Sequence, residues 1–205
     1  MSRPAAPQSC LVKREEKEDR LKAFVLQHIA DRRSQAVDDH ATPTCLLLAR
    51  SAESPVAKTV LSLGAKADLK GFAVRAIFAH LGTAETARIA EACRVSDWAL
   101  QIRWARDLRL LDAHEQLVMG PAMSWMGDCM RRDPMNRDAC EQFAADCHVT
   151  ARRGALYFER IWQLSEPIFE RQGFEMAAAP DPTLVPLVEQ LAASGNNRLR
   201  PRTSF

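Results

Sequence analysis

Short apolar runs alternate along the chain with segments of helical periodicity, and this alternation restricts the folds open to it. Residues 44–49 (TCLLLA) and 72–79 (FAVRAIFA) have the length and composition of buried strands. Between them, Ser54 and Pro55 are typical of a helix start, and Gly64 of a helix end. A second helix is expected over residues 84–93. The order strand, helix, strand, helix predicts an α/β fold with a mixed, largely parallel sheet flanked by helices.

The ends of the chain predict one domain with two extensions. Residues 13–33 carry apolar side chains at helical spacing and predict an N-terminal helix. The Pro- and Ala-rich residues 1–12 before it are expected to be disordered. The single α/β domain is therefore assigned to residues 13–168. Residues 169–205 form a C-terminal extension, partly mobile, with a possible short helix over 184–193 and an arginine-rich end.

Residues 98–111 admit two interpretations. Trp98, Leu100, Ile102 and Trp104 alternate with smaller or polar residues, which is the period of a strand. The same segment also fits a helical stripe, and a helix-turn-helix at about 84–110 is then the alternative. In that case the chain would be a winged-helix DNA-binding transcriptional regulator, with residues 114–127 as its wing. The strand is preferred, since the domain is not basic overall and a recognition helix with two tryptophans would be unusual.

The second half of the domain predicts a hairpin, a strand and a long helix. Residues 117–119 and 124–126 flank Gly120 and Pro121, which indicate a turn. A polar loop follows over 131–138. Residues 143–149 alternate as in a strand, and Thr150 is expected to cap a final helix that continues to Leu164.

Composition narrows the classes of function. The net charge is +2, so no strong electrostatic case for nucleic acid or membrane binding arises. None of the six cysteines forms a C-x-x-C pair, and no metal or cofactor is expected. We find no apolar run that could span a bilayer and no signal-peptide core, and therefore expect a cytoplasmic protein with reduced thiols.

Residues 114–127 (HEQLVMGPAMSWMG) carry the most specific motif. They resemble the core of the phospholipase D catalytic motif, which has His-x-Lys, four further residues, an Asp and then Gly-Ser-x-Asn. His114 matches the His. Gln116 stands at the Lys position, and the Asp position falls at Gly120 or Pro121. Residues 127–130 (GDCM) replace the Gly-Ser-x-Asn. The ending FERIWQLSEPI resembles the last helix of such a repeat, so the resemblance covers residues 40–168.

The resemblance implies a single phospholipase D-like repeat with a lost active site. In that family one His attacks phosphorus, the other protonates the leaving oxygen, and Lys holds developing negative charge. Gln116 offers a dipole but no charge. The expected function is therefore non-enzymatic: a scaffold, or a module that binds a ligand or partner. If any activity remains, weak phosphodiesterase-type chemistry through His114 is expected.

The candidate binding residues and partners follow from the same resemblance. An anionic small ligand could contact His114, Gln116, Arg131 and Arg132. Family members with one repeat pair two copies, which implies a homodimer. Nucleic acid is a less favoured partner. Two further clusters are interpreted as structural, because their spacing does not suit a metal: residues 38–40 (DDH), and Cys140 with Cys147 and His148.

Overall fold

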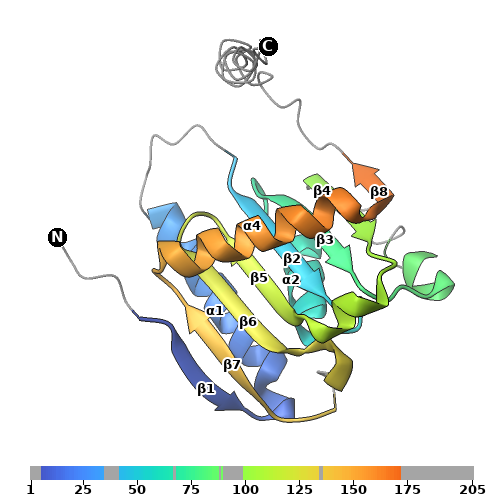
Figure 1. Ribbon diagram of the computed structural model, residues 1–205. Coiled ribbons are helices and arrows are strands. Elements are labelled where there is room, and N and C mark those ends of the chain that lie inside the picture. Colours follow the sequence, from blue (N-terminus) through green and yellow to red (C-terminus); the bar gives the residue numbers. More distant parts are fainter. Residues whose placement is uncertain are drawn as a thin grey trace, which may run out of the picture. The chain divides into compact units, whose positions relative to one another are not determined.

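A mixed eight-stranded sheet forms the centre of the computed structural model (Figure 1). The structure describes residues 6–34, 42–66, 68–87, 89, 99–133 and 136–171. All of these belong to one compact unit, residues 1–173. The strand order is β1-β7-β6-β5-β2-β3-β4-β8. The strands are β1 (Gln8–Val12), β2 (Thr44–Ala49), β3 (Ala73–Phe78), β4 (Ala99–Trp104), β5 (His114–Met119), β6 (Met123–Cys129), β7 (Ala139–Ala144) and β8 (Glu166–Arg171).

The parallel part of the sheet is limited to its middle. Strands β2, β3 and β4 are parallel neighbours, as the strand–helix–strand pattern predicts. Strands β5, β6 and β7 form an antiparallel meander that continues to β1, and β8 pairs antiparallel with β4. The α/β class and the mixed sheet are thus confirmed, but most neighbouring pairs among the described strands are antiparallel. Among them, only β5 and β6 are joined by a short turn, which can connect only antiparallel neighbours. The pairs β1–β7, β2–β5 and β4–β8 bring together strands that are distant in the chain.

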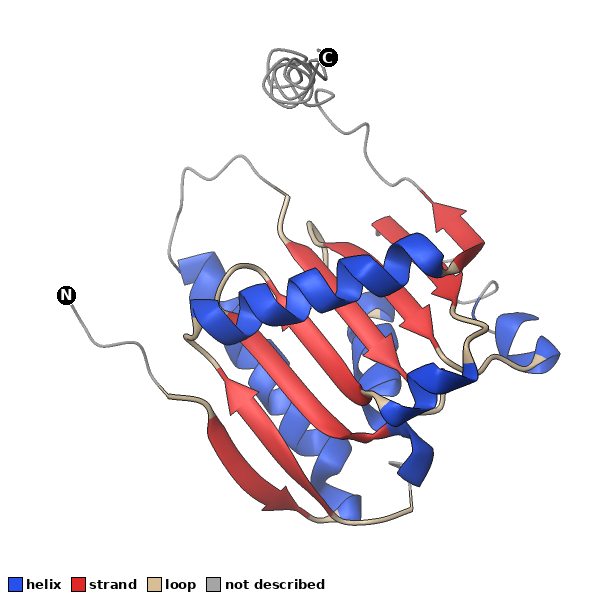
Figure 2. Ribbon diagram, viewed as in Figure 1, coloured by secondary structure: helices blue, strands red, loops and turns tan. Residues whose placement is uncertain are grey.

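Helices cover the two faces of the sheet differently (Figure 2). Helices α1 (Lys17–Ser34) and α2 (Pro55–Ala65) lie on one face, and α4 (His148–Leu164) crosses the other. Short 3-10 helices precede α1 (η1, Arg14–Glu16) and flank β5 and β6 (η2, Leu108–Asp112; η3, Met130–Arg132). No helix within the described ranges is both long and apolar enough to cross a membrane.

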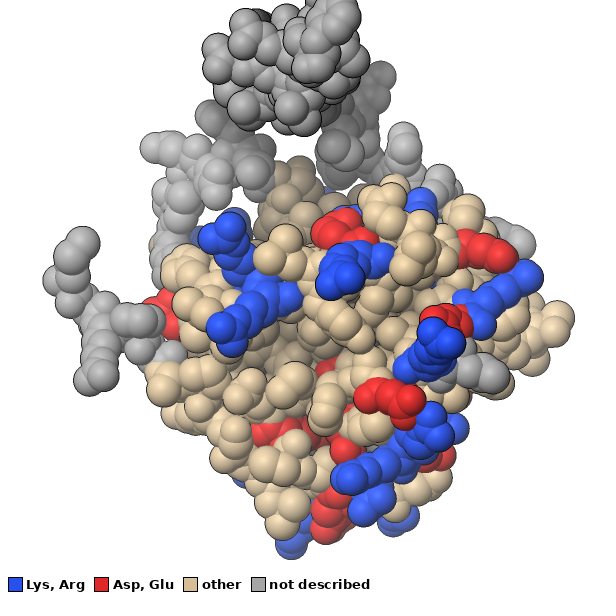
Figure 3. Space-filling view, viewed as in Figure 1, with Lys and Arg blue, Asp and Glu red and all other residues tan. Residues whose placement is uncertain are grey.

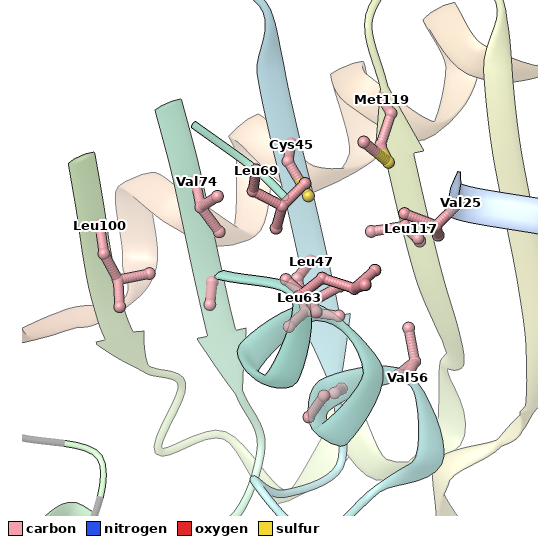
Figure 4. Packing of buried hydrophobic residues seen from close by; sticks show 14 of the residues in the cluster. Val25, Cys45, Leu47, Val56, Leu63, Leu69, Val74, Leu100, Leu117 and Met119 are labelled. Atoms are coloured by element: carbon pink, nitrogen blue, oxygen red, sulfur yellow. The ribbon is translucent and has the colours of Figure 1, made fainter. Parts of the chain in front are cut away.

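The larger core lies between the sheet and helices α1 and α2 (Figure 4). Strand β2 supplies residues to both faces, with Cys45 and Leu47 toward α1 and α2, and Leu46 and Leu48 toward α4. This explains why TCLLLA is a continuous apolar run instead of an alternating one. Burial also raises the pKa of the Cys45 thiol to about 12.

Most elements expected from the sequence are present. The helix over 13–33, the strands over 44–49 and 72–79 and the helix after Ser54 correspond to η1 with α1, β2, β3 and α2. Residues 99–104 form β4 between β3 and β8, so the preferred strand is confirmed for this segment. Loop residues 35–41, residues 91–98 with Cys93 and Trp98, and everything beyond 171 lie outside the described residues.

Four expectations about local structure are wrong. Residues 8–12 are not disordered but form β1, because they pair with β7 along their whole length. The strand expected over 143–149 is β7 at 139–144, and α4 begins at His148, so Val149 lies on an exposed helix surface. Thr150 lies in the first helical turn and Cys147 precedes it as the N-cap. Finally, residues 166–171 are β8 and do not loosen, so the domain extends past 168.

Candidate functional site

His114 lies at the edge of the sheet where the carboxyl ends of three parallel strands meet. The carboxyl ends of β2, β3 and β4 are in register there, at Ala49, Phe78 and Trp104. Strand β5 runs antiparallel to β2, so its first residue, His114, lies at the same edge. In open α/β sheets this edge is the usual place for ligand sites. The fold therefore places His114 where a site would be expected.

The His114 ring is held by the neighbouring strand. Its Nδ1 lies 2.8 Å from the carbonyl oxygen of Gly127 on β6. A carbonyl can only accept, so Nδ1 carries the proton and Nε2 is left as the unprotonated nitrogen of the neutral ring. The residue is exposed. His114 thus has a fixed orientation and an accessible Nε2, which are the minimal requirements for a base or a ligand.

Gln116 is positioned under helix α4. The helix approaches β5 closely at Gly154, where a Cβ would lie 2.6 Å from Gln116 Nε2 and 2.8 Å from Val118 Cγ2. Gln116 Nε2 is buried and has no hydrogen-bond partner. The position that corresponds to the family lysine is therefore covered by a helix and filled by a neutral amide.

Arg131 and Arg132 follow the motif on η3 and are paired with acids. Arg131 Nε lies 2.6 Å from Asp112 Oδ1, and Arg132 Nη1 lies 3.7 Å from Asp128 Oδ1. Both arginine side chains are about 60% exposed, so these pairs contribute little to stability. An anion that bound here would have to compete with the two carboxylates.

The turn residues Gly120 and Pro121 are far from His114. They follow the last residue of β5, whereas His114 is its first, so about 20 Å of strand separates them. Gly120 has a φ of 61° and closes the hairpin beside the side chains of Arg32 and His28 on α1. A carboxylate at this turn could not orient the His114 imidazole of the same strand.

Glu115 is a buried carboxyl that the sequence analysis missed. It is 1% exposed and lies on the opposite side of β5 from Gln116. Burial raises its pKa to about 7, although hydrogen bonds with Ser54 and from the Arg50 backbone N–H oppose this shift. Its spacing could have indicated its burial, because Glu115, Leu117 and Met119 alternate along β5 and lie on one buried face.

A second buried carboxyl lies near Glu115. Glu141 on β7 accepts a hydrogen bond from Trp125 Nε1 at 3.0 Å and lies 3.6 Å from Lys17 Nζ. Its pKa is raised, mainly by burial, while Trp125 and Lys17 lower it. Lys17, Glu115 and Glu141 are each at most 2% exposed. This group therefore contains two carboxyls and one ammonium, and Glu115 can remain neutral by keeping its proton.

The remaining candidates do not converge with His114. Cys140 is exposed on β7, while Cys147 and His148 lie at the start of α4. In the described part of the chain no three His, Cys, Asp or Glu side chains are placed to hold a metal. Trp125 and Trp162 are buried, as expected for core residues. Residues 38–40 lie outside the described ranges.

Comparison with known proteins identifies the fold. No protein-family model and no curated protein matches the sequence. The structure is similar to that of Nuc from Salmonella typhimurium, a phospholipase D family member. The TM-score is 0.51 and the identity 13%, over 81% of this chain and 100% of that one. NucT from Helicobacter pylori gives a TM-score of 0.50 and 11% identity, over 79% and 99%. The fold is phospholipase D-like.

The phospholipase D-like fold agrees with the family resemblance given for residues 40–168. Sequence identities of 13% and 11% support a shared fold but not a shared activity. The winged-helix alternative is not favoured. Its recognition helix would occupy residues 97–110, but β4 fills 99–104 of that range and is paired on both sides.

Proposed function

We propose that this chain is a non-enzymatic phospholipase D-like module that acts by binding a partner or ligand. The observation that carries the proposal is the environment of Gln116. A phosphodiesterase centre needs positive charge against the developing negative charge of the transition state. At the family's lysine position this chain has a neutral amide, enclosed between β5 and α4.

Partner binding is the form of this function that the contacts favour. An anionic small ligand at His114, Gln116, Arg131 and Arg132 would meet two arginines already paired with Asp112 and Asp128. The sheet face on the α4 side, in contrast, is uncovered over β7 and β1 (Figure 2). Leu11 on β1 and Met126 on β6 are 69% and 41% exposed. We infer that a second copy of the chain covers this face as a homodimer.

We also propose that the protein resides in a reducing, cytoplasmic environment. Cys10, Cys45, Cys129, Cys140 and Cys147 are all free thiols. Unpaired cysteines at exposed positions such as Cys140 are typical of proteins kept in a reducing compartment.

Turnover of an activated phosphodiester tests the loss of enzymatic activity. We expect no hydrolysis of bis(p-nitrophenyl) phosphate above the buffer rate, for the wild type and for His114→Ala alike. Each missing transition-state interaction typically lowers a rate roughly a hundred-fold or more. Release of nitrophenolate is followed by absorbance. Clear turnover by the wild type that disappears in His114→Ala would contradict the proposal and identify a residual phosphodiesterase.

A further inference from the structure

Helix α4 exposes an apolar and basic stripe opposite its buried face. Ala151, Phe158 and Trp162 are buried against the sheet. On the other side, Val149, Leu156 and Leu164 are 61%, 59% and 87% exposed. Arginines alternate with them along the same line. We call this stripe the α4 ridge: Val149, Arg153, Leu156, Arg160 and Leu164.

The ridge is positively charged without internal compensation. The single acid of α4, Glu159, forms a bidentate ion pair with Arg75 on β3. Among the residues that the structure describes, no carboxylate lies within ion-pair distance of Arg153 or Arg160. Figure 3 shows basic side chains at the α4 side of this face, with uncharged surface between them and acidic side chains beside some of them. Within the described part of the chain, the ridge therefore combines exposed apolar area with arginines that have no carboxylate partner.

A cleft of about 210 Å³ adjoins the C-terminal half of the ridge. Tyr157, Ile161 and Leu164 form its α4 wall, and Arg106, Asp107 and Arg109 line it from the segment that follows β4. Arg106 is paired with Glu166 at 3.0 Å, whereas Arg109 has no carboxylate partner within the described ranges. The cleft therefore offers an apolar wall for an anchor residue of a partner, while its two arginines are offset by Asp107 and Glu166.

We propose that the α4 ridge and this cleft dock an acidic amphipathic helix of another protein. Val149 and Leu156 are seven residues apart, as are Arg153 and Arg160, which is the heptad spacing of paired helices. Leucines of the partner would cover Val149 and Leu156, and its glutamates would face Arg153 and Arg160. The inference extends the proposed partner-binding role to a surface separate from the His114 site.

The charge of the ridge argues against a second copy as the occupant. Two α4 ridges placed together would bring arginines against arginines, and like charges across an interface disfavour association. An acidic partner turns the same arginines into attractive contacts that direct encounter and fix register.

Fluorescence anisotropy with a labelled synthetic peptide tests the proposal. The probe is a three-heptad helix with leucine at its a and d positions and glutamate at e and g. The glutamates keep the peptide from pairing with itself at neutral pH. The full-length protein should bind it at least about tenfold more tightly than the matched peptide with lysine in place of glutamate. The double variant Arg153→Glu/Arg160→Glu should reverse this preference, and Leu164→Ser should weaken binding through the cleft.

Thermal midpoints confirm that these exposed substitutions leave the fold intact. Equal affinity for the two peptides, or binding of the acidic peptide that the double variant retains, would overturn the proposal. Arginine-dependent binding to phosphatidylserine vesicles without peptide binding would also overturn it, since the surface would then recognise lipid. Unchanged dimer mass in the double variant is expected, and its loss would assign the ridge to self-association. The peptide and vesicle measurements can be interpreted whether or not the protein hydrolyses the phosphodiester.

Discussion

At the scale of single residues, the buried Glu115 links the stability of the protein to pH. Its pKa is about 7 in the folded protein and 4.5 when unperturbed, so the folded state keeps a proton that the unfolded state releases between these values. The contribution of Glu115 to the free energy of unfolding is therefore full below pH 4.5 and falls as pH rises to about 7. Above about pH 7, Glu115 is ionised in the folded protein and adds a buried negative charge near Lys17.

Glu115→Gln removes this dependence, because the amide is neutral at every pH. We expect the variant and the wild type to be similar in stability near pH 4.5. At pH 8 the variant should be more stable by roughly 3 kcal/mol, the free energy that corresponds to the pKa shift. Urea unfolding across this pH range measures the difference. Glu18→Gln, at an exposed position of α1, is the control, and a difference that does not change with pH would contradict the prediction.

Gly154 decides how closely α4 approaches β5. Gly154→Ala gains about 1 kcal/mol of helix propensity but places a Cβ 2.6 Å from Gln116 Nε2 and 2.8 Å from Val118 Cγ2. Overpacking of this kind costs roughly 1–3 kcal/mol, so we expect a net loss of stability in denaturant unfolding. In a Val118→Ala background the loss should shrink, whereas Arg153→Ala on the opposite side of α4 should be close to neutral. A more stable Gly154→Ala would show that the helix has room to move.

At the scale of the element, α4 is fixed to the sheet by Trp162. The indole stacks on Phe158 at 5.5 Å, and the guanidinium carbons of Arg75 and Arg103 lie 4.1 and 4.4 Å from its ring centroid. Trp162→Ala should lower the free energy of unfolding by roughly 3–5 kcal/mol. Tyr157→Ala, on the exposed side of the same helix, should cost far less. Similar midpoints for the two variants would mean that Trp162 does not anchor the helix.

At the scale of the whole molecule, the uncovered sheet face predicts a homodimer. We expect light scattering to give about twice the 22.9 kDa of one chain at micromolar concentration. An isologous interface around Met126 and Leu11 would need to bury about 1,000 Å² or more in total. Met126→Arg should shift the mass toward that of one chain. At a concentration where the wild type is monomeric, the two proteins should have the same thermal midpoint. A mass that stays near one chain at every concentration would contradict the dimer.

The sequence by itself determined the elements whose reasons are local. Thr44–Ala49 is apolar throughout, Ser54 and Pro55 start α2, and Ala99–Trp104 alternates with the strand period. The motif at His114 led to the phospholipase D-like fold for the same reason, since its residues are contiguous. Tertiary structure decided the rest. Strands β1 and β8 exist because β7 and β4 offer them partners, which no local propensity reveals. Likewise, only the folded chain brings Lys17, Glu115 and Glu141 from three separate elements into one buried group, and burial then shifts the pKa of both carboxyls.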